Sequence, residues 1–190
     1  MSRFLFLLVA GAALAVAPVR AQTMSVLTSE SSITYDGTSP IHDWDATSRR
    51  VTGTLRLNAS DPAQSSFVLQ APVASFDSGN RTRDRNMREA TEADRFPNVR
   101  FSSGAIVVRS WSGSPGARQG RWRVSGSLTF SGVRRTVTVE VNAREERGRF
   151  IATGRFPISL SDFDVDRPGI GPVKIGDEIQ LSFEVVGRLP

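Results

Sequence analysis

The chain has 190 residues, which suffices for one domain with a sizeable core, and it carries a formal net charge of +5 and no cysteine. The lack of cysteine excludes disulfides, thiol chemistry and cysteine-ligated metals, and the single histidine, His42, excludes a metal site with two imidazole ligands. Lys174 is the only lysine, and the arginines are spread along the chain rather than gathered in a tract, so the positive charge does not indicate a nucleic-acid partner.

The first 21 residues have the pattern of a secretory signal peptide. Arg3 supplies a positive charge, residues 4–16 form an apolar run, and Val19 and Ala21 are small residues at the two positions that signal peptidase reads. The apolar run of about 13 residues is shorter than the roughly 20 that a membrane-spanning helix needs. We expect cleavage after Ala21 and a mature domain over residues 22–190, in the periplasm or outside the cell of a bacterium, with no integral membrane segment.

Alternating apolar and polar residues predict about eight β-strands in the mature chain. The alternation begins at Ile33 and Tyr35 and recurs over residues 51–57, 67–73, 99–108, 122–130, 137–143, 150–160 and 179–185. We expect an all-β, antiparallel fold that closes as an eight-stranded barrel, with a two-layer sandwich as the alternative. Glycines on the apolar face, at Gly53, Gly126 and Gly154, favour the barrel, because a missing side chain permits strong coiling or leaves room inside.

One segment interrupts this alternation. Residues 82–93 favour a helix, with Met87 and Ala90 on its thin apolar face, and Pro97 stands where the next strand should begin. The sequence therefore predicts a short helical insertion between two strands of the barrel.

Two motifs could carry chemistry, and neither is complete. His42-Asp43-Trp44 pairs a base with a carboxylate, but it also suits residues that close one end of a barrel. Asp162, Asp164 and Asp166 have the spacing of calcium ligands, yet the glycine and glutamate that such a loop needs later are missing. No glycine-rich phosphate loop and no G-x-S-x-G elbow occurs. We therefore expect a protein that is not an enzyme and that has no metal site and no cofactor.

Several segments in order resemble the YceI-like family of secreted, lipocalin-like barrels. They are Gly37-Thr38-Ser39 with His42-Asp43-Trp44, Asn86-Met87-Arg88-Glu89-Ala90 followed by Phe96-Pro97-Asn98-Val99-Arg100-Phe101, the hairpin from Gly126 through Gly132-Val133-Arg134-Arg135 to Val137, and Ile175-Gly176-Asp177-Glu178-Ile179. Other branches carry a histidine after the Arg-Asp pair near the helix, whereas here Arg85-Asn86-Met87 follows Arg83-Asp84.

The resemblance implies a lipocalin-like barrel that holds a polyisoprenoid or another long-chain lipid without catalysis. We expect the bound chain to contact apolar side chains on the inner strand faces, with His42 and Trp44 at the barrel mouth. The predicted lining residues are Phe76, Met87, Phe101, Trp122, Leu128, Phe130, Phe156, Ile158, Leu181 and Phe183.

Two other functions remain open at this point. The barrel could be solid and bind a protein partner through its loops over residues 112–120 and 166–176, as a module of an envelope stress or redox system. His42 and Asp43 could instead serve a hydrolase or an isomerase. The sequence also leaves open whether the protein forms a homodimer.

Overall fold

The computed structural model describes residues 21–38, 40, 43–167, 169–170 and 173–189. Ten strands form one antiparallel sheet in the order β1-β4-β5-β6-β7-β8-β9-β12-β2-β3, and β10 and β11 form a small second sheet. The strands are β1 (Gln22–Ser25), β2 (Ser32–Gly37), β3 (Trp44–Ser48), β4 (Thr52–Leu57), β5 (Ser66–Pro72), β6 (Asn98–Val108), β7 (Gln119–Phe130), β8 (Val133–Glu146), β9 (Arg149–Ser159), β10 (Gly169–Ile170), β11 (Val173–Lys174) and β12 (Glu178–Arg188).

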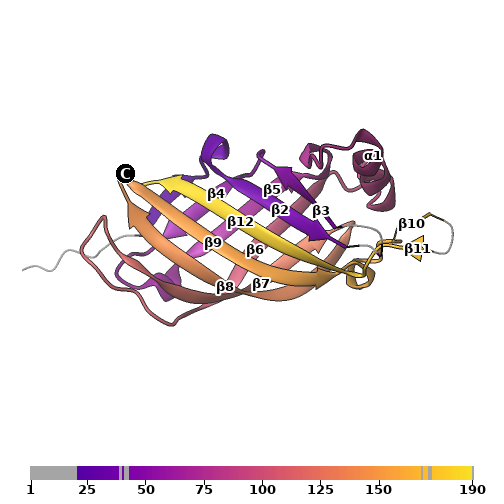
Figure 1. Ribbon diagram of the computed structural model, residues 1–190. Coiled ribbons are helices and arrows are strands. Elements are labelled where there is room, and N and C mark those ends of the chain that lie inside the picture. Colours follow the sequence, from indigo (N-terminus) through magenta and orange to yellow (C-terminus); the bar gives the residue numbers. More distant parts are fainter. Residues whose placement is uncertain (1–20, 39, 41–42, 168, 171–172, 190) are drawn as a thin grey trace, which may run out of the picture.

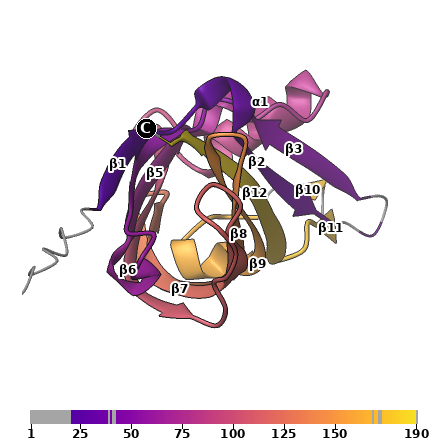
Figure 2. The same cartoon turned by 90° about the vertical axis from the view of Figure 1, so that its left-hand side faces the viewer.

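The large sheet is strongly curled (Figure 1, Figure 2), and its two edge strands, β1 and β3, do not pair with each other. Near β1, an isolated bridge joins Val26 to Gly187 of β12. At the other edge, Thr47 of β3 exchanges two backbone hydrogen bonds with Asp77, at N–O distances of 3.0 and 3.1 Å. Each bridge joins one edge of the sheet to another part of the chain, and neither joins the two edges to each other. The sheet therefore forms an elongated, incomplete barrel.

The prediction of an all-β antiparallel fold is confirmed, but the sheet has ten strands rather than eight. The two additional strands are β1 and β3. β1 is only four residues long, too short for alternation to reveal. β3 contains Asp45 and Ala46, which are poor strand formers. It adopts a strand conformation because it pairs with β2 in a hairpin, in which Ala46 lies opposite Tyr35.

The barrel wall is split between β8 and β9. Pairing of these strands begins at their shared turn and stops at Val141 and Gly154, so the remaining parts of the two strands diverge. A 3₁₀ turn, η4 (Leu160–Phe163), packs against β8 in this region. Its Phe163 ring is buried and meets the Phe130 ring edge-on at 5.8 Å. Apolar side chains thus seal the part of the wall where backbone pairing is missing.

The helical insertion is α1 (Arg81–Ala90), which begins one residue before the predicted segment, 82–93, and ends three residues earlier. Its start is set by Asn80, whose side-chain oxygen accepts hydrogen bonds from two backbone N–H groups of the first turn at 3.0 and 3.1 Å. Its end is set by Glu92, which adopts a left-handed φ of 48°, and by Ala93, whose N–H donates to the carbonyl of Arg88 at 2.9 Å. Three further 3₁₀ turns complete the fold: η1 (Thr28–Glu30), η2 (Pro62–Gln64) and η3 (Val73–Ser75).

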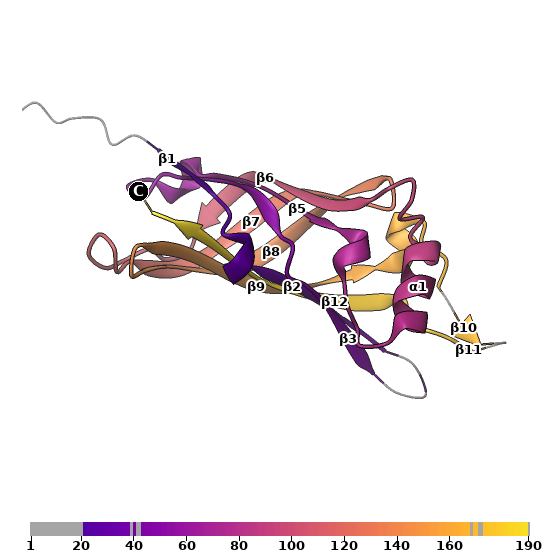
Figure 3. The ribbon, with the colours of Figure 1, turned by 90° about the horizontal axis from the view of Figure 1, so that it is seen from above.

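The helix lies across one end of the barrel, next to β10 and β11, and the carboxyl end of β12 lies at the other (Figure 1, Figure 3). A buried carboxylate attaches α1 to the preceding loop. Asp84 is 8% exposed and accepts hydrogen bonds from the backbone N–H and the hydroxyl of Ser78, at 3.1 and 2.6 Å. The position of the helix over the barrel end is therefore fixed by polar contacts.

Two inward-facing glycines make room for phenylalanine rings. Phe183 lies directly opposite Gly154 in the β9–β12 ladder, and a Cβ atom at Gly154 would lie 2.7 Å from its ring. A Cβ atom at Gly126 would likewise lie 2.5 Å from the ring of Phe101 on the neighbouring strand. Both distances are far below van der Waals contact, so each ring occupies the space that a side chain would take. The rings thus lie against the wall instead of projecting across the barrel.

The substitution Gly154→Ala tests this placement. We expect a fall of about 1–3 kcal/mol in the free energy of unfolding, because the new methyl group must displace the Phe183 ring. In a Phe183→Leu background the same substitution should cost less, since the ring is gone and only the backbone oxygen of Glu140, at 2.9 Å, stays close to the new Cβ atom. Urea denaturation of the four proteins of this cycle measures both values. Gly104→Ala is the matched control, because its Cβ would meet only the Ser125 carbonyl, at 3.2 Å. Equal losses in the two backgrounds would contradict the proposed ring placement.

Candidate functional site

A cavity of about 430 Å³ lies inside the barrel. Its wall is mainly apolar and is formed by inward-facing side chains of the curled sheet, together with residues of α1 and β11 at one end. The volume is within the range of about 300–1,000 Å³ that is typical of small-molecule pockets. The interior is therefore not filled by the protein's own side chains, which differs from the solid barrel considered as an alternative.

Most of the predicted lining residues border this cavity. Nine of the ten do so: Phe76, Met87, Phe101, Leu128, Phe130, Phe156, Ile158, Leu181 and Phe183. Trp44, predicted at the barrel mouth, also borders it, whereas His42 lies outside the described residues. Contact of these side chains with a ligand stays a prediction.

Trp122 lies elsewhere. Its side chain points into the barrel, as the alternation indicates, but it is 0% exposed and stacks on Phe150 at a ring-centroid distance of 5.7 Å. It belongs to a packed layer of side chains. This layer lies beyond one end of the cavity, the end farther from α1. The alternation of a strand identifies the face of a side chain, and it does not indicate how far along the barrel axis the open space extends.

Polar side chains border the cavity mainly at its α1 end, and the sequence analysis did not identify them. They are Asn80, Thr82, Arg83, Asn86 and Thr91 of the helix region and Lys174 of β11. A signal for part of this set exists in the sequence. One face of the helix carries Arg83, Asn86, Met87 and Ala90, because each lies three or four residues from another member of the set. Only the two apolar residues of this face, Met87 and Ala90, were predicted.

Aromatic and charged groups come together beside this polar end. The Tyr35 and Phe76 rings lie 5.7 Å apart, and the Arg83 guanidinium lies 5.2 Å from the centre of the Trp44 ring, a cation–π geometry. Burial raises the pKa of the Tyr35 hydroxyl to about 12, although a hydrogen bond with Trp44 acts in the opposite direction. Tyr35 is therefore a neutral hydrogen-bonding group at physiological pH.

Of the two incomplete motifs only the aspartate series can be placed, because His42 lies outside the described residues. Across those residues, no three histidine, aspartate or glutamate side chains lie together in a way that could hold a metal ion. Asp162 lies in η4, and Asp164 caps that turn with a left-handed φ of 55°. No helix among the same residues is long and apolar enough to cross a bilayer.

One family model and several solved structures are similar to this chain. The family model for the YceI-like domain matches residues 25–187. Among solved structures, BcnA of Burkholderia cenocepacia aligns with a TM-score of 0.71 at 24% identity, covering 85% of this chain and 98% of its own. A polyisoprenoid binding domain from Saccharophagus degradans, implicated in plant cell wall breakdown, aligns with a TM-score of 0.71 at 14% identity, covering 88% and 98%.

A third similar structure is the YceI protein of Campylobacter jejuni, with a TM-score of 0.56 at 14% identity and coverage of 100% of this chain and 99% of the other. No curated protein matched the sequence. Identities this low establish a shared fold.

Tyr35 provides a direct test of the geometry around the polar end, because it is the only tyrosine in the chain. We expect its phenolate absorbance to appear with a midpoint near pH 12 in the folded protein, since burial disfavours the charged form. In denaturant the midpoint should return to about 10. Because the folded-state pKa is the higher one, this group should favour folding below pH 10, and its contribution should be lost as the pH rises toward 12. A folded-state midpoint near 10 would contradict the burial of the hydroxyl.

Proposed function

The chain belongs to the YceI-like family, and we propose that it is a non-catalytic binding protein that holds a long apolar molecule, a polyisoprenoid or another lipid, inside its barrel. The observation that carries the proposal is the cavity of about 430 Å³ with its mainly apolar wall. The name of the Saccharophagus degradans domain, which shares the fold, supports a polyisoprenoid as the ligand.

The energetics of such binding need no charged anchor. Burial of apolar surface contributes about 25 cal/mol per Å², so a chain that buries about 400 Å² gains about 10 kcal/mol. This gain is of the same order as the roughly 4–15 kcal/mol that association costs in lost freedom of motion. Apolar cavities of this kind hold water weakly or not at all, so the ligand displaces little that is favourable. The gain grows with each apolar carbon buried, so a longer chain should bind more tightly than a shorter one.

The distribution of polar groups suggests how the ligand is oriented. Asn80, Asn86 and Lys174 border the cavity at the α1 end, and the opposite end is apolar and aromatic. A molecule with a hydrogen-bonding head and an apolar tail satisfies both ends only when the head lies at α1 and the tail points away from it. We therefore place the entrance of the cavity at the helix.

The proposal extends to the location of the protein. With the signal peptide removed after Ala21, residues 22–190 would form the binding domain in the periplasm or outside the cell. A soluble carrier in that compartment would shield a lipid chain from water. The bound lipid would then be its only non-protein component, with no nucleic-acid partner and no catalytic turnover.

A substitution that fills the lumen should abolish binding. Leu181 borders the cavity and is paired with Tyr35 and Phe156, so Leu181→Trp adds a bulky ring to the interior near the helix. We expect the affinity for geranylgeraniol to fall by about tenfold or more, because the ring takes the volume that the chain needs. Uptake is measured by native mass spectrometry and by calorimetric titration.

Gln180→Trp is the matched control. This residue precedes Leu181 on the same strand and faces the other side of the sheet, so the same ring is added without entering the cavity. Thermal unfolding checks that both variants fold. If Leu181→Trp binds the prenol as tightly as Gln180→Trp and the original protein, the cavity is not the binding site.

A further inference from the structure

The end of the cavity opposite α1 is closed by stacked aromatic rings. Phe67 borders the cavity and is 7% exposed, and its ring stacks on Trp122 and Phe150 at centroid distances of 6.2 and 6.4 Å. Trp122 and Phe150 are both 0% exposed. We call these three residues the aromatic floor. Interiors packed in this way leave no space into which an additional methylene group could fit.

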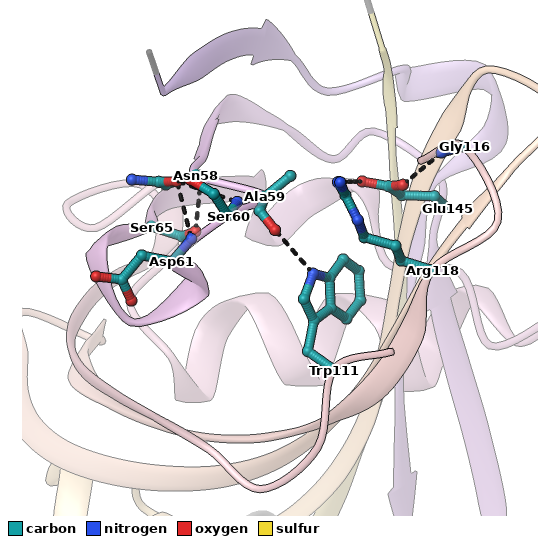
Figure 4. Close-up of polar contacts among 9 residues, drawn as sticks. All are labelled: Asn58, Ala59, Ser60, Asp61, Ser65, Trp111, Gly116, Arg118 and Glu145. Atoms are coloured by element: carbon teal, nitrogen blue, oxygen red, sulfur yellow. Dashed lines mark hydrogen bonds and ion pairs between the residues drawn. The ribbon is translucent and has the colours of Figure 1, made fainter. Parts of the chain in front are cut away.

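A loop between β6 and β7 packs against the aromatic floor through Trp111, whose hydrogen bond to Ala59 is drawn in Figure 4. Its Trp111 ring meets Trp122 edge-on at 5.1 Å, and the indole N–H donates a hydrogen bond to the carbonyl of Ala59 at 3.1 Å. The segment after β4 that supplies this carbonyl is itself held by Asn58, whose side-chain oxygen accepts from the backbone N–H groups of Ser60 and Asp61 at 3.2 and 3.0 Å. The floor is therefore backed by a second aromatic layer with a polar anchor.

A buried carboxylate holds the other half of the same loop (Figure 4). The side chain of Glu145 is only 3% exposed, and it accepts a hydrogen bond from the backbone N–H of Gly116 at 2.8 Å and forms an ion pair with Arg118 at 3.4 Å. The backbone N–H of Glu145 also donates to the carbonyl of Arg118 at 2.7 Å. Opening the loop would break these three contacts together, which is unfavourable. This end of the barrel is therefore closed by its architecture.

From these contacts we propose that the aromatic floor sets the greatest length of apolar chain that the cavity accepts, with Phe67 as the residue that the chain end meets. The inference rests on the proposed binding function and adds a specificity-determining element to it. A chain too long for the cavity cannot displace the floor, so its additional carbons stay at the α1 end, in contact with water. Affinity should then rise with chain length up to a limit and rise no further beyond it.

The test is a ladder of prenols of increasing length, bound to the full mature chain and measured by native mass spectrometry in competition. Phe67→Ala and the milder Phe67→Leu remove part of the aromatic floor and so lengthen the cavity. The limit should therefore move to longer prenols. Chains longer than the original limit by about one isoprene unit should gain about tenfold in affinity. Ala152→Leu acts in the opposite direction, because Ala152 borders the same part of the cavity and a larger side chain there raises the floor. Its limit should move to shorter prenols.

Phe183→Leu is the matched control, because Phe183 borders the cavity along the wall and not at the floor. It should change the affinity for all prenols alike and leave the limit where it is. If the Phe67 and Ala152 variants remain folded and keep the original limit, the floor does not set the length. If the original protein binds no prenol of any length, the proposed function itself is wrong. If it binds prenols but the limit does not move in the variants, only the proposal about chain length is wrong.

Discussion

An open interior in this barrel depends on aromatic rings lying over glycine. Phe101 and Phe183 project inward, and rings of this size would meet across a narrow barrel if they pointed toward its axis. Gly126 and Gly154 on the neighbouring strands give each ring a place against the wall. The wall becomes thicker and more apolar at these points, and the volume at the centre is left for a ligand. The same aromatic residues that would close an ordinary core therefore line a cavity here.

The two ends of the cavity differ in chemistry and in how firmly they are held. At one end, α1 contributes amide and guanidinium groups, and the helix is fixed by the Asp84 carboxylate and the Asn80 cap. At the other, stacked rings are backed by Trp111 and by the buried ion pair of Glu145. A tube that is polar at one end and closed by aromatic rings at the other suits molecules with a head and a tail. This asymmetry gives the proposed ligand its direction.

Alternation in the sequence was sufficient to predict the all-β fold and the inward face of the side chains on strands that border the cavity, because the two faces of a strand differ in their exposure to water. It could not place Trp122, because alternation does not show how far along the barrel axis a residue lies. That position depends on how many residues each strand extends past its neighbour. β1 and β3 escaped detection because they are short and are stabilised by pairing rather than by their own propensity. The polar end was missed because Arg83 and Asn86 look like the solvent side of a helix until the helix is placed over an opening.

The central claim is that the interior is an apolar space occupied by a long-chain molecule. Native mass spectrometry of the protein purified without detergent tests it most directly, when combined with organic extraction of the same sample. The account predicts a mass above that of the polypeptide, with the excess recovered in the organic phase as one class of long apolar molecule. A bare polypeptide mass that persists after incubation with prenols and fatty acids of several lengths would contradict it.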